Sequence, residues 1–202
     1  ITVKLFLILL LLLSVQQLGQ GGYIYAKAIL AQYLIESAWD KTLQGESHVK
    51  PWSWADTWPV AKLTVNSTNT TLYILAGDNG RTLAFGPGYR FGTDLPGVDG
   101  TSIISGHRDT HFAFLRNIKI EDEIEIQNTK GEIIKYRVNN TEIVSVDDAL
   151  FIDQGQSSKI TLVTCYPFDT ILTGGKLRYI VSAKKIDKLL ASSSSVIENS
   201  NE

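Results

Sequence analysis

The sequence predicts an all-β domain, an antiparallel barrel or sandwich, that follows an apolar and helical N-terminal region. Short runs rich in β-branched and aromatic residues recur with turn residues between them, a spacing that favours these folds over alternating β-α units. One pair of runs, "DEIEIQNTKGEIIKYRV", alternates with period two on both sides of Asn-Thr-Lys-Gly, which predicts a hairpin. The eight runs are "VAKLTV", "TLYIL", "TSIIS", "EIEIQ", "IIKYRV", "EIVSV", "KITLVT" and "LRYIVSA".

The first 18 residues are predicted to be a membrane anchor. Lys4 precedes an unbroken apolar stretch from Leu5 to Leu13 that continues to Val15. A run of this length overlaps both a signal-peptide core and a short membrane span, but no small-x-small cleavage pattern follows it, so an uncleaved anchor is favoured over a removed signal. We therefore expect a single-pass membrane protein, with the rest of the chain outside the cytoplasmic membrane.

Residues 19–48 are predicted to form an amphipathic helix and a linker. From Tyr23 to Leu43 apolar residues recur at helical spacing, and no proline interrupts them. The glycines of "GQGG" are expected to separate this helix from the anchor. The main domain is expected to cover residues 49–188, and the polar, serine-rich tail at 189–202 is predicted to be disordered.

The main domain begins with "HVKPWSWADTWPVAKL", which contains two prolines and three tryptophans. This composition favours an extended segment over a helix. Trp52, Trp54 and Trp58 are expected to pack half-buried against the barrel, since aromatic clusters mostly serve cores.

Charge and cysteine content narrow the possible functions. The 202-residue chain has 19 Lys and Arg against 21 Asp and Glu, a net charge of −2, and no basic block, so a nucleic-acid partner is not expected. The one cysteine, Cys165, has no partner for a disulfide within the chain, so it is either a small apolar core residue or a reactive thiol.

Cys165 is expected at the end of a buried strand. "KITLVT" supplies the strand, and the Tyr-Pro pair after the cysteine cannot easily continue a β-ladder, so the sulfur should lie at the rim of the sheet. A thiol attacks as thiolate, so a reactive cysteine needs a base or a cation nearby and partial exposure. Taken alone, Cys165 would more often be a core residue.

Two further residues favour a catalytic role for this thiol. His107 follows a predicted strand in "ISGHRDTHFAFL", so its imidazole is also expected at a strand end, where it could protonate a leaving amine. His111 is the competing candidate, and capping or packing is expected of it. Arg178 in "GGKLRYIV" would lie on the next strand and could stabilise an oxyanion, although most arginines are simply exposed. Arg108 and the adjacent aspartate either orient the imidazole or pair with each other.

This combination resembles the sortases, which are membrane-anchored cysteine transpeptidases. The family pattern Thr-Leu-x-Thr-Cys is matched at residues 161–165, with "SGHRDTHF" upstream and an arginine in the following strand. The resemblance covers residues 50 to 186. "PWSWADTWPVAKL" and "LAFGPG" also resemble the subgroup of sortases in Gram-negative bacteria, of the marine proteobacterial type.

The resemblance implies an eight-stranded β-barrel in which cysteine, histidine and arginine meet in one groove. It implies that Cys165 attacks a backbone carbonyl in a C-terminal sorting motif of a secreted protein, commonly of the Leu-Pro-x-Thr-Gly type, and that an amine acceptor resolves the thioacyl enzyme. His107 would act as general acid and base, and Arg178 would hold the substrate backbone and the oxyanion. No cofactor is implied.

Other interpretations stay open at this point. A hydrolytic cysteine peptidase would share the chain order, although the caspase-type signature is absent. A membrane-tethered β-barrel that binds a partner would use Cys165 as a core residue. Neither Asp147–Asp148 nor the acidic residues 121–123 have the alternating spacing of a calcium loop, so they are predicted to be solvated surface and no metal is expected. "LPGVDG" at 95–100 is interpreted as a structural loop and not as a sorting motif.

Overall fold

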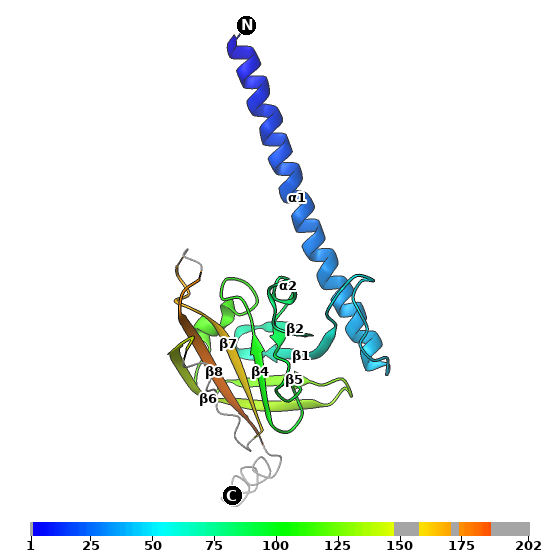
Figure 1. The fold of residues 1–202 in the computed structure, drawn as a ribbon, viewed down its shortest axis with the longest axis vertical. Coiled ribbons are helices and arrows are strands. Elements are labelled where there is room, and N and C mark those ends of the chain that lie inside the picture. Colours follow the sequence, from blue (N-terminus) through cyan, green and yellow to red (C-terminus); the bar gives the residue numbers. More distant parts are fainter. Residues whose placement is uncertain (1, 148–157, 171–173, 187–202) are drawn as a thin grey trace, which may run out of the picture.

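Eight strands close into a barrel, and one long helix projects from it (Figure 1), within the part of the chain that the computed structural model describes: residues 2–147, 158–170 and 174–186. The strand order around the barrel is β1-β2-β3-β4-β7-β8-β6-β5. The strands are β1 (Pro59–Val65), β2 (Thr70–Ala76), β3 (Gly88–Tyr89), β4 (Thr101–Ser105), β5 (Glu123–Gln127), β6 (Ile133–Ser145), β7 (Lys159–Tyr166) and β8 (Leu177–Lys185). The helical elements are α1 (Thr2–Leu43), η1 (Asn66–Thr68), α2 (Gly80–Leu83) and η2 (Ala113–Asn117).

The predicted barrel is confirmed, but its eight strands are not the eight predicted runs. "IIKYRV" and "EIVSV" belong to one strand, β6, because the polar residues between them form a bulge opposite β8, between Val138 and Asn140, and do not break the pairing. The two-residue strand β3 was not expected from its Pro-Gly-Tyr sequence. Gly88 is needed there, since a Cβ would lie 2.3 Å from the carbonyl oxygen of Gly77.

Two neighbouring pairs of the barrel are parallel, β2 with β3 and β4 with β7, whereas the sequence predicted antiparallel pairing throughout. Parallel neighbours need a long connection. The chain between β4 and β7 provides it with η2 and the β5–β6 hairpin, which was predicted and is confirmed. In the hairpin loop the Asn128 side chain accepts hydrogen bonds from the backbone N–H groups of Lys130 and Glu132, each at 3.0 Å.

Alternation along the strands fills the barrel with branched aliphatic side chains. In β5 only Ile124 and Ile126 are buried, because successive residues point to opposite faces of the sheet. Every strand contributes to this interior. Its fully enclosed members include Leu63, Ile74, Ile104, Ile124, Ile126, Tyr136, Ile160, Leu162 and Val181.

Helix α1 is continuous from Thr2 to Leu43, so the expected separation at "GQGG" is wrong. A glycine inside a helix costs about 1 kcal/mol relative to alanine, which weakens a helix without ending it, and no proline is present. The helix is long and apolar enough to cross a membrane, with a mean hydropathy of 1.7 in its apolar window, none of which is buried against the barrel.

The C-terminal part of α1 docks on β1 and β2. Ala31, Ile35, Ala38 and Trp39 are buried along one face, the helical spacing that the sequence indicated for part of this stretch. Two side-chain hydrogen bonds border this apolar contact between α1 and the barrel. The hydroxyl of Tyr73 donates to a carboxylate oxygen of Glu36 (3.1 Å), and the amide of Gln32 donates to the carbonyl of Phe85 (2.7 Å). Burial, followed by the Glu36 carboxylate, raises the pKa of Tyr73 to about 12.

The expectation for the tryptophans holds for two of the three. The Trp52 ring packs edge-on against Phe85, and Trp58 lies 4.6 Å from the His48 ring and borders the core. Trp54 is 83% exposed and does not pack on the barrel. The tail at 189–202, predicted to be disordered, lies outside the described residues.

The barrel interior sets the stability of the fold. We expect Ile126→Ala to lower the free energy of unfolding by about 2–5 kcal/mol, because Ile126 is fully enclosed and its truncation leaves a cavity. Ile133→Ala is the matched control, since Ile133 is 60% exposed and its truncation should cost about 0.5 kcal/mol or less. Urea unfolding followed by circular dichroism measures both; equal losses would contradict the assigned barrel interior.

Candidate active site

Three adjacent strands, β4, β7 and β8, bring the predicted catalytic residues together. In the antiparallel pair β7–β8, Cys165 lies directly opposite Arg178. In the parallel pair β4–β7, the register runs to Ser105 opposite Val163. Two parallel strands run in the same direction, so residues counted forward from a matched pair stay level with each other. Two residues after Ser105 is His107, and two residues after Val163 is Cys165. The three residues therefore come to the same level of neighbouring strands.

The backbone holds His107 at this level even though β4 has ended. The N–H of Gly106 donates to the carbonyl of Val163 (3.0 Å), and the Thr164 hydroxyl donates to the carbonyl of Gly106 (2.7 Å). Gly106 also lets the turn close, since a Cβ there would lie 2.6 Å from the buried Phe112 ring. The N–H of Phe112 donates to the carbonyl of His107 (3.0 Å), which fixes the turn that follows the histidine.

The site lies on the outer face of the barrel. Val163 and Cys165 are two residues apart on β7 and share a face, as do Ile180 and Arg178 on β8. That face carries a small apolar cluster outside the barrel interior. Its members are Ile103, Val163 and Ile180, with Val144 packed against them. Cys165 and Arg178 thus extend an apolar floor at the ends of the strands.

Exposure at the site fits a reactive centre. Cys165 is half-buried and forms no disulfide, so the alternative of a thiol enclosed in the core is not what the structure shows. His107 is exposed and Arg178 is half-buried. One guanidinium nitrogen of Arg178, Nη1, donates to the carbonyls of Gly175 (2.8 Å) and Leu177 (2.9 Å), so the arginine is held by its own connection between β7 and β8.

His111 lies near His107 but in a different environment. It is half-buried, and Thr110 Oγ1 lies 3.4 Å from its Nδ1. Burial lowers the pKa of His111 below its usual value, and the charge of His107 lowers it further. His111 follows the turn beyond the strand end, whereas His107 is level with the thiol. This geometry favours His107 as the residue that works with Cys165.

Arg108 is the feature of this site that the sequence did not resolve. Its side chain is only 7% exposed, and its Nη2 donates to the carbonyl of Thr170 at 2.9 Å. The pairing with Asp109 considered from the sequence is present as well, with Nε to Oδ1 at 3.5 Å. The motif drew attention to this arginine, but its side chain is buried where it meets a carbonyl 62 residues away in the chain.

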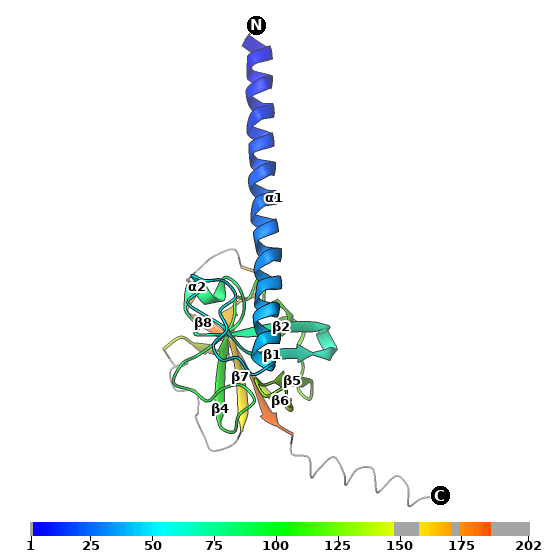
Figure 2. The ribbon, with the colours of Figure 1, turned by 90° about the vertical axis from the view of Figure 1, so that its right-hand side faces the viewer.

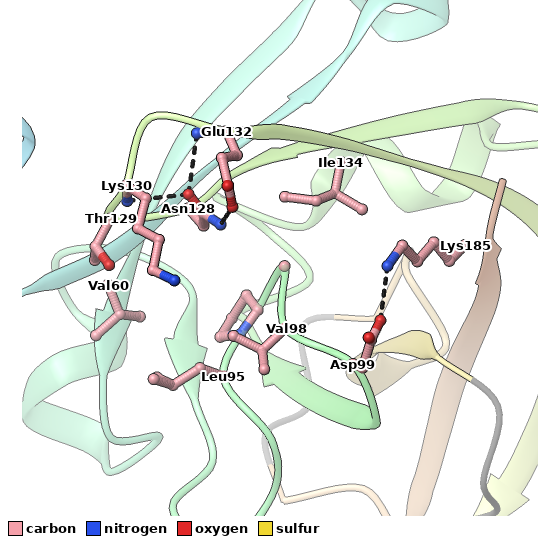
Figure 3. Close-up of a pocket in the computed structure, with 12 residues that line it drawn as sticks. Val60, Leu95, Val98, Asp99, Asn128, Thr129, Lys130, Glu132, Ile134 and Lys185 are labelled. Carbon is pink, nitrogen blue, oxygen red and sulfur yellow. Dashed lines mark hydrogen bonds and ion pairs between the residues drawn. The ribbon is translucent and has the colours of Figure 1, made fainter. Parts of the chain in front are cut away.

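A hollow lies at the opposite end of the barrel from Cys165. The loop of residues 95–99 and the β5–β6 hairpin enclose a volume of about 300 Å³ (Figure 3). Lys185, at the far end of β8 from Arg178, forms an ion pair with Asp99 there (2.6 Å). "LPGVDG" forms one wall of this hollow and is thus part of the barrel's own loop structure.

The acidic residues considered for calcium have other partners. Glu121 and Glu123 pair with Arg137, and Asp122 accepts hydrogen bonds from Ser67 and from the backbone N–H of Lys119. Asp147 is exposed, while Asp148 lies outside the described residues. Among the residues that the structure describes, no three histidine, cysteine, aspartate or glutamate side chains gather so as to hold a metal ion.

Comparison with known proteins accounts for this arrangement. Residues 63–186 match the sequence model of the sortase domain, which is more than half of the chain. The chain belongs to the sortase family. The eight-stranded closed barrel is the sortase fold that the resemblance implied.

Individual sortases show the same relationship. The chain is 31% identical to sortase D of Bacillus subtilis (strain 168) over 125 residues, which are 61% of this chain and 62% of that protein. The match thus spans less than two thirds of the relative's length. Among solved structures, it resembles the Clostridium perfringens sortase D5 transpeptidase (TM-score 0.58, 26% identity, 75% of this chain and 89% of that one). It also resembles sortase C-1 of Actinomyces oris (TM-score 0.57, 28% identity, 64% and 75%). Placement in the Gram-negative subgroup stays a prediction.

The environment of His111 gives a testable titration. We expect its imidazole to titrate below the usual pKa of about 6.5, because burial disfavours the charged form. His107→Ala should raise the pKa of His111 without restoring it fully, since the repelling charge is removed and the burial remains. NMR titration of the imidazole resonances measures both values. A His111 that titrates at or above 6.5 in the unmodified protein would show that the side chain is more hydrated than the structure indicates.

Proposed function

We propose that this sortase is a cysteine transpeptidase in which Cys165, His107 and Arg178 act together. The observation that carries the proposal is the shared level of the three residues, with Cys165 directly opposite Arg178 and the backbone of β7 holding the turn that carries His107. The catalytic domain is taken as residues 49–188, as the sequence predicted. The partly exposed thiol supports this function over a binding module with a structural cysteine.

The first half-reaction forms a thioester. The Cys165 thiol gives its proton to His107, and its sulfur attacks a backbone carbonyl carbon of the substrate; a carbon–sulfur bond forms while the carbonyl oxygen takes up negative charge. Arg178 donates to that oxygen, and positioned donors of this kind lower the barrier most where charge develops. The amide carbon–nitrogen bond then breaks, and His107 gives a proton to the departing amine.

The second half-reaction releases the product. An incoming amine loses a proton to His107, attacks the thioester carbon, and expels the Cys165 thiolate. A covalent intermediate divides one difficult amide exchange into two easier steps. Water in place of the amine would yield hydrolysis, so exclusion of water from the apolar floor favours transfer.

The substrates proposed are secreted proteins with a C-terminal sorting motif of the Leu-Pro-x-Thr-Gly type, and the acceptor is an amine. The resemblance to sortases supports this class. The outer cluster of Ile103, Val163 and Ile180 beside the thiol supports it as well, because such a floor offers an apolar contact for the leucine of the motif.

The protein is proposed to be anchored in the cytoplasmic (inner) membrane by α1, with the barrel on the periplasmic side. The uncovered apolar half of α1 supports this placement. In Figures 1 and 2, α1 projects beyond the end of the barrel at which β8 begins, and the same end of β7 carries Cys165. The catalytic end therefore faces the same way as the anchor.

Substitution of the three residues tests the mechanism. We expect Cys165→Ala to abolish turnover, and His107→Ala and Arg178→Ala to lower kcat/KM by roughly 10²–10⁴, the range for loss of a proton-transfer group or an oxyanion donor. His111→Ala should cost less than about tenfold, because His111 lies off the level of the thiol. The measurement is intact-mass spectrometry with a panel of Leu-Pro-x-Thr-Gly peptides, in which the unmodified chain gains the peptide portion through Thr.

Each result separates the alternatives. Substantial turnover by Cys165→Ala would contradict the proposed mechanism. If no adduct or cleaved peptide forms while iodoacetamide labels Cys165, the thiol is accessible and the substrate class is wrong. If the thiol resists labelling in the folded protein, a partner-binding barrel with a structural cysteine becomes the better description.

The single cysteine also allows a test of topology. In intact spheroplasts, a membrane-impermeant maleimide should label Cys165, because it is half-buried and the barrel is placed outside the membrane. The Cys165→Ala protein provides the background. Labelling that appears only after the cells are lysed would place the barrel on the cytoplasmic side and overturn the localisation.

A further inference from the structure

Arg108 connects the two chain segments that carry the histidine and the cysteine. It follows His107 directly, and its Nη2 donates to the carbonyl of Thr170, five residues after Cys165 in the chain. The hydrogen bond therefore joins the turn after β4 to the connection between β7 and β8. At 2.9 Å it has a good length for a charged donor.

The burial of this guanidinium is unusual. Arginine is rarely enclosed, and removing its charge from water is costly unless its donors are satisfied. The side chain of Arg108 is 7% exposed, whereas Asp109, which offers the opposite charge at 3.5 Å, is 66% exposed. A contact that served only as a surface ion pair would leave the arginine in solvent.

Arg116 provides a contrast across the same two segments. It pairs with Asp169 (3.2 Å) and lies over the Phe168 ring at 5.4 Å, so it too links the region after β4 with the chain after Cys165. Its side chain is 43% exposed and that of Asp169 is 89% exposed. Screening by water makes such a pair weak. The two arginines join the same segments, but only Arg108 does so from a buried position next to the catalytic histidine.

We propose that Arg108 is a positioning residue: its buried guanidinium fixes the turn bearing His107 against the segment after Cys165, and so sets the imidazole relative to the thiol. This inference rests on the proposed function. Arg108 acts through the Thr170 carbonyl and the backbone of its own turn. A misplacement of about 1 Å between reacting groups can cost 10²-fold in rate, so a contact of this kind affects the chemical step more than substrate binding.

Arg108→Met tests the assignment, with Arg116→Met as the matched control that removes one positive charge from the same pair of segments. We expect R108M to lower kcat by about tenfold or more with KM changed less than about threefold. We expect R116M to stay within about twofold of the unmodified protein in both, because its ion pair is exposed. Thermal unfolding followed by circular dichroism confirms that each variant is folded.

The second readout is the rate of Cys165 alkylation by iodoacetamide at one fixed pH, which needs no substrate. A histidine level with the thiol can take up its proton as the sulfur attacks, so a displaced His107 should lower this rate by about threefold or more in R108M. R116M should react at the rate of the unmodified protein. R108K keeps the positive charge and so separates the loss of charge from the loss of geometry.

The outcomes are decisive in either direction. A folded R108M with the kcat and alkylation rate of R116M overturns the proposal. If R108M does not fold, R108K is measured: a folded R108K with kcat lowered at least about threefold supports the positioning role, whereas an unchanged kcat or failure to fold assigns Arg108 to stability alone. If the unmodified protein turns over no peptide, the proposed function fails, and the alkylation rates of R108M and R116M still decide the role of Arg108.

Discussion

The pairing of β7 with β4 on one side and β8 on the other is the constraint on which the site depends. Main-chain hydrogen bonds fix register to a single residue, and a slip of one residue would turn every side chain of β7 to the opposite face. The parallel partner determines where the histidine comes, and the antiparallel partner determines where the arginine comes. The thiol occupies the middle strand of three, so the positions of the histidine and the arginine relative to it follow from one backbone.

The two faces of these strands have different roles: the inner face forms the barrel core and the outer face carries the site. Leu162 and Val181 point into the barrel and belong to its enclosed core, while their neighbours Val163 and Ile180 form the outer floor. The interior supplies the free energy that keeps the register, and the outer face remains available for a peptide. The packed core holds these strands in place, so side chains at the strand ends are positioned with few additional contacts.

The sequence predicted what depends on local chemistry. Alternation indicated the strands, and Tyr-Pro after Cys165 indicated a strand end. It missed features that depend on distant or weak effects. β3 has only two residues and is held by its neighbours. The bulge near Asn140 resembles a break until β8 is alongside, and Arg108 is buried where it meets the distant Thr170 carbonyl. The helix continues past Gly19 because the loss of a few tenths to one kcal/mol per glycine is tolerated where nothing opposes it.

The continuity of α1 has a mechanical consequence. With residues 1–18 in the bilayer as proposed, the helix runs 13 residues from Leu18 to Ala31, the first side chain buried against the barrel, a stand-off of about 20 Å. In a rigid helix, the distance of the barrel from the membrane and the orientation of the barrel around the helix axis change together. Each added residue would move the barrel away from the membrane by about 1.5 Å and rotate it by about 100° around the helix axis, so only changes near a whole number of turns would keep Cys165 on the same side of the helix.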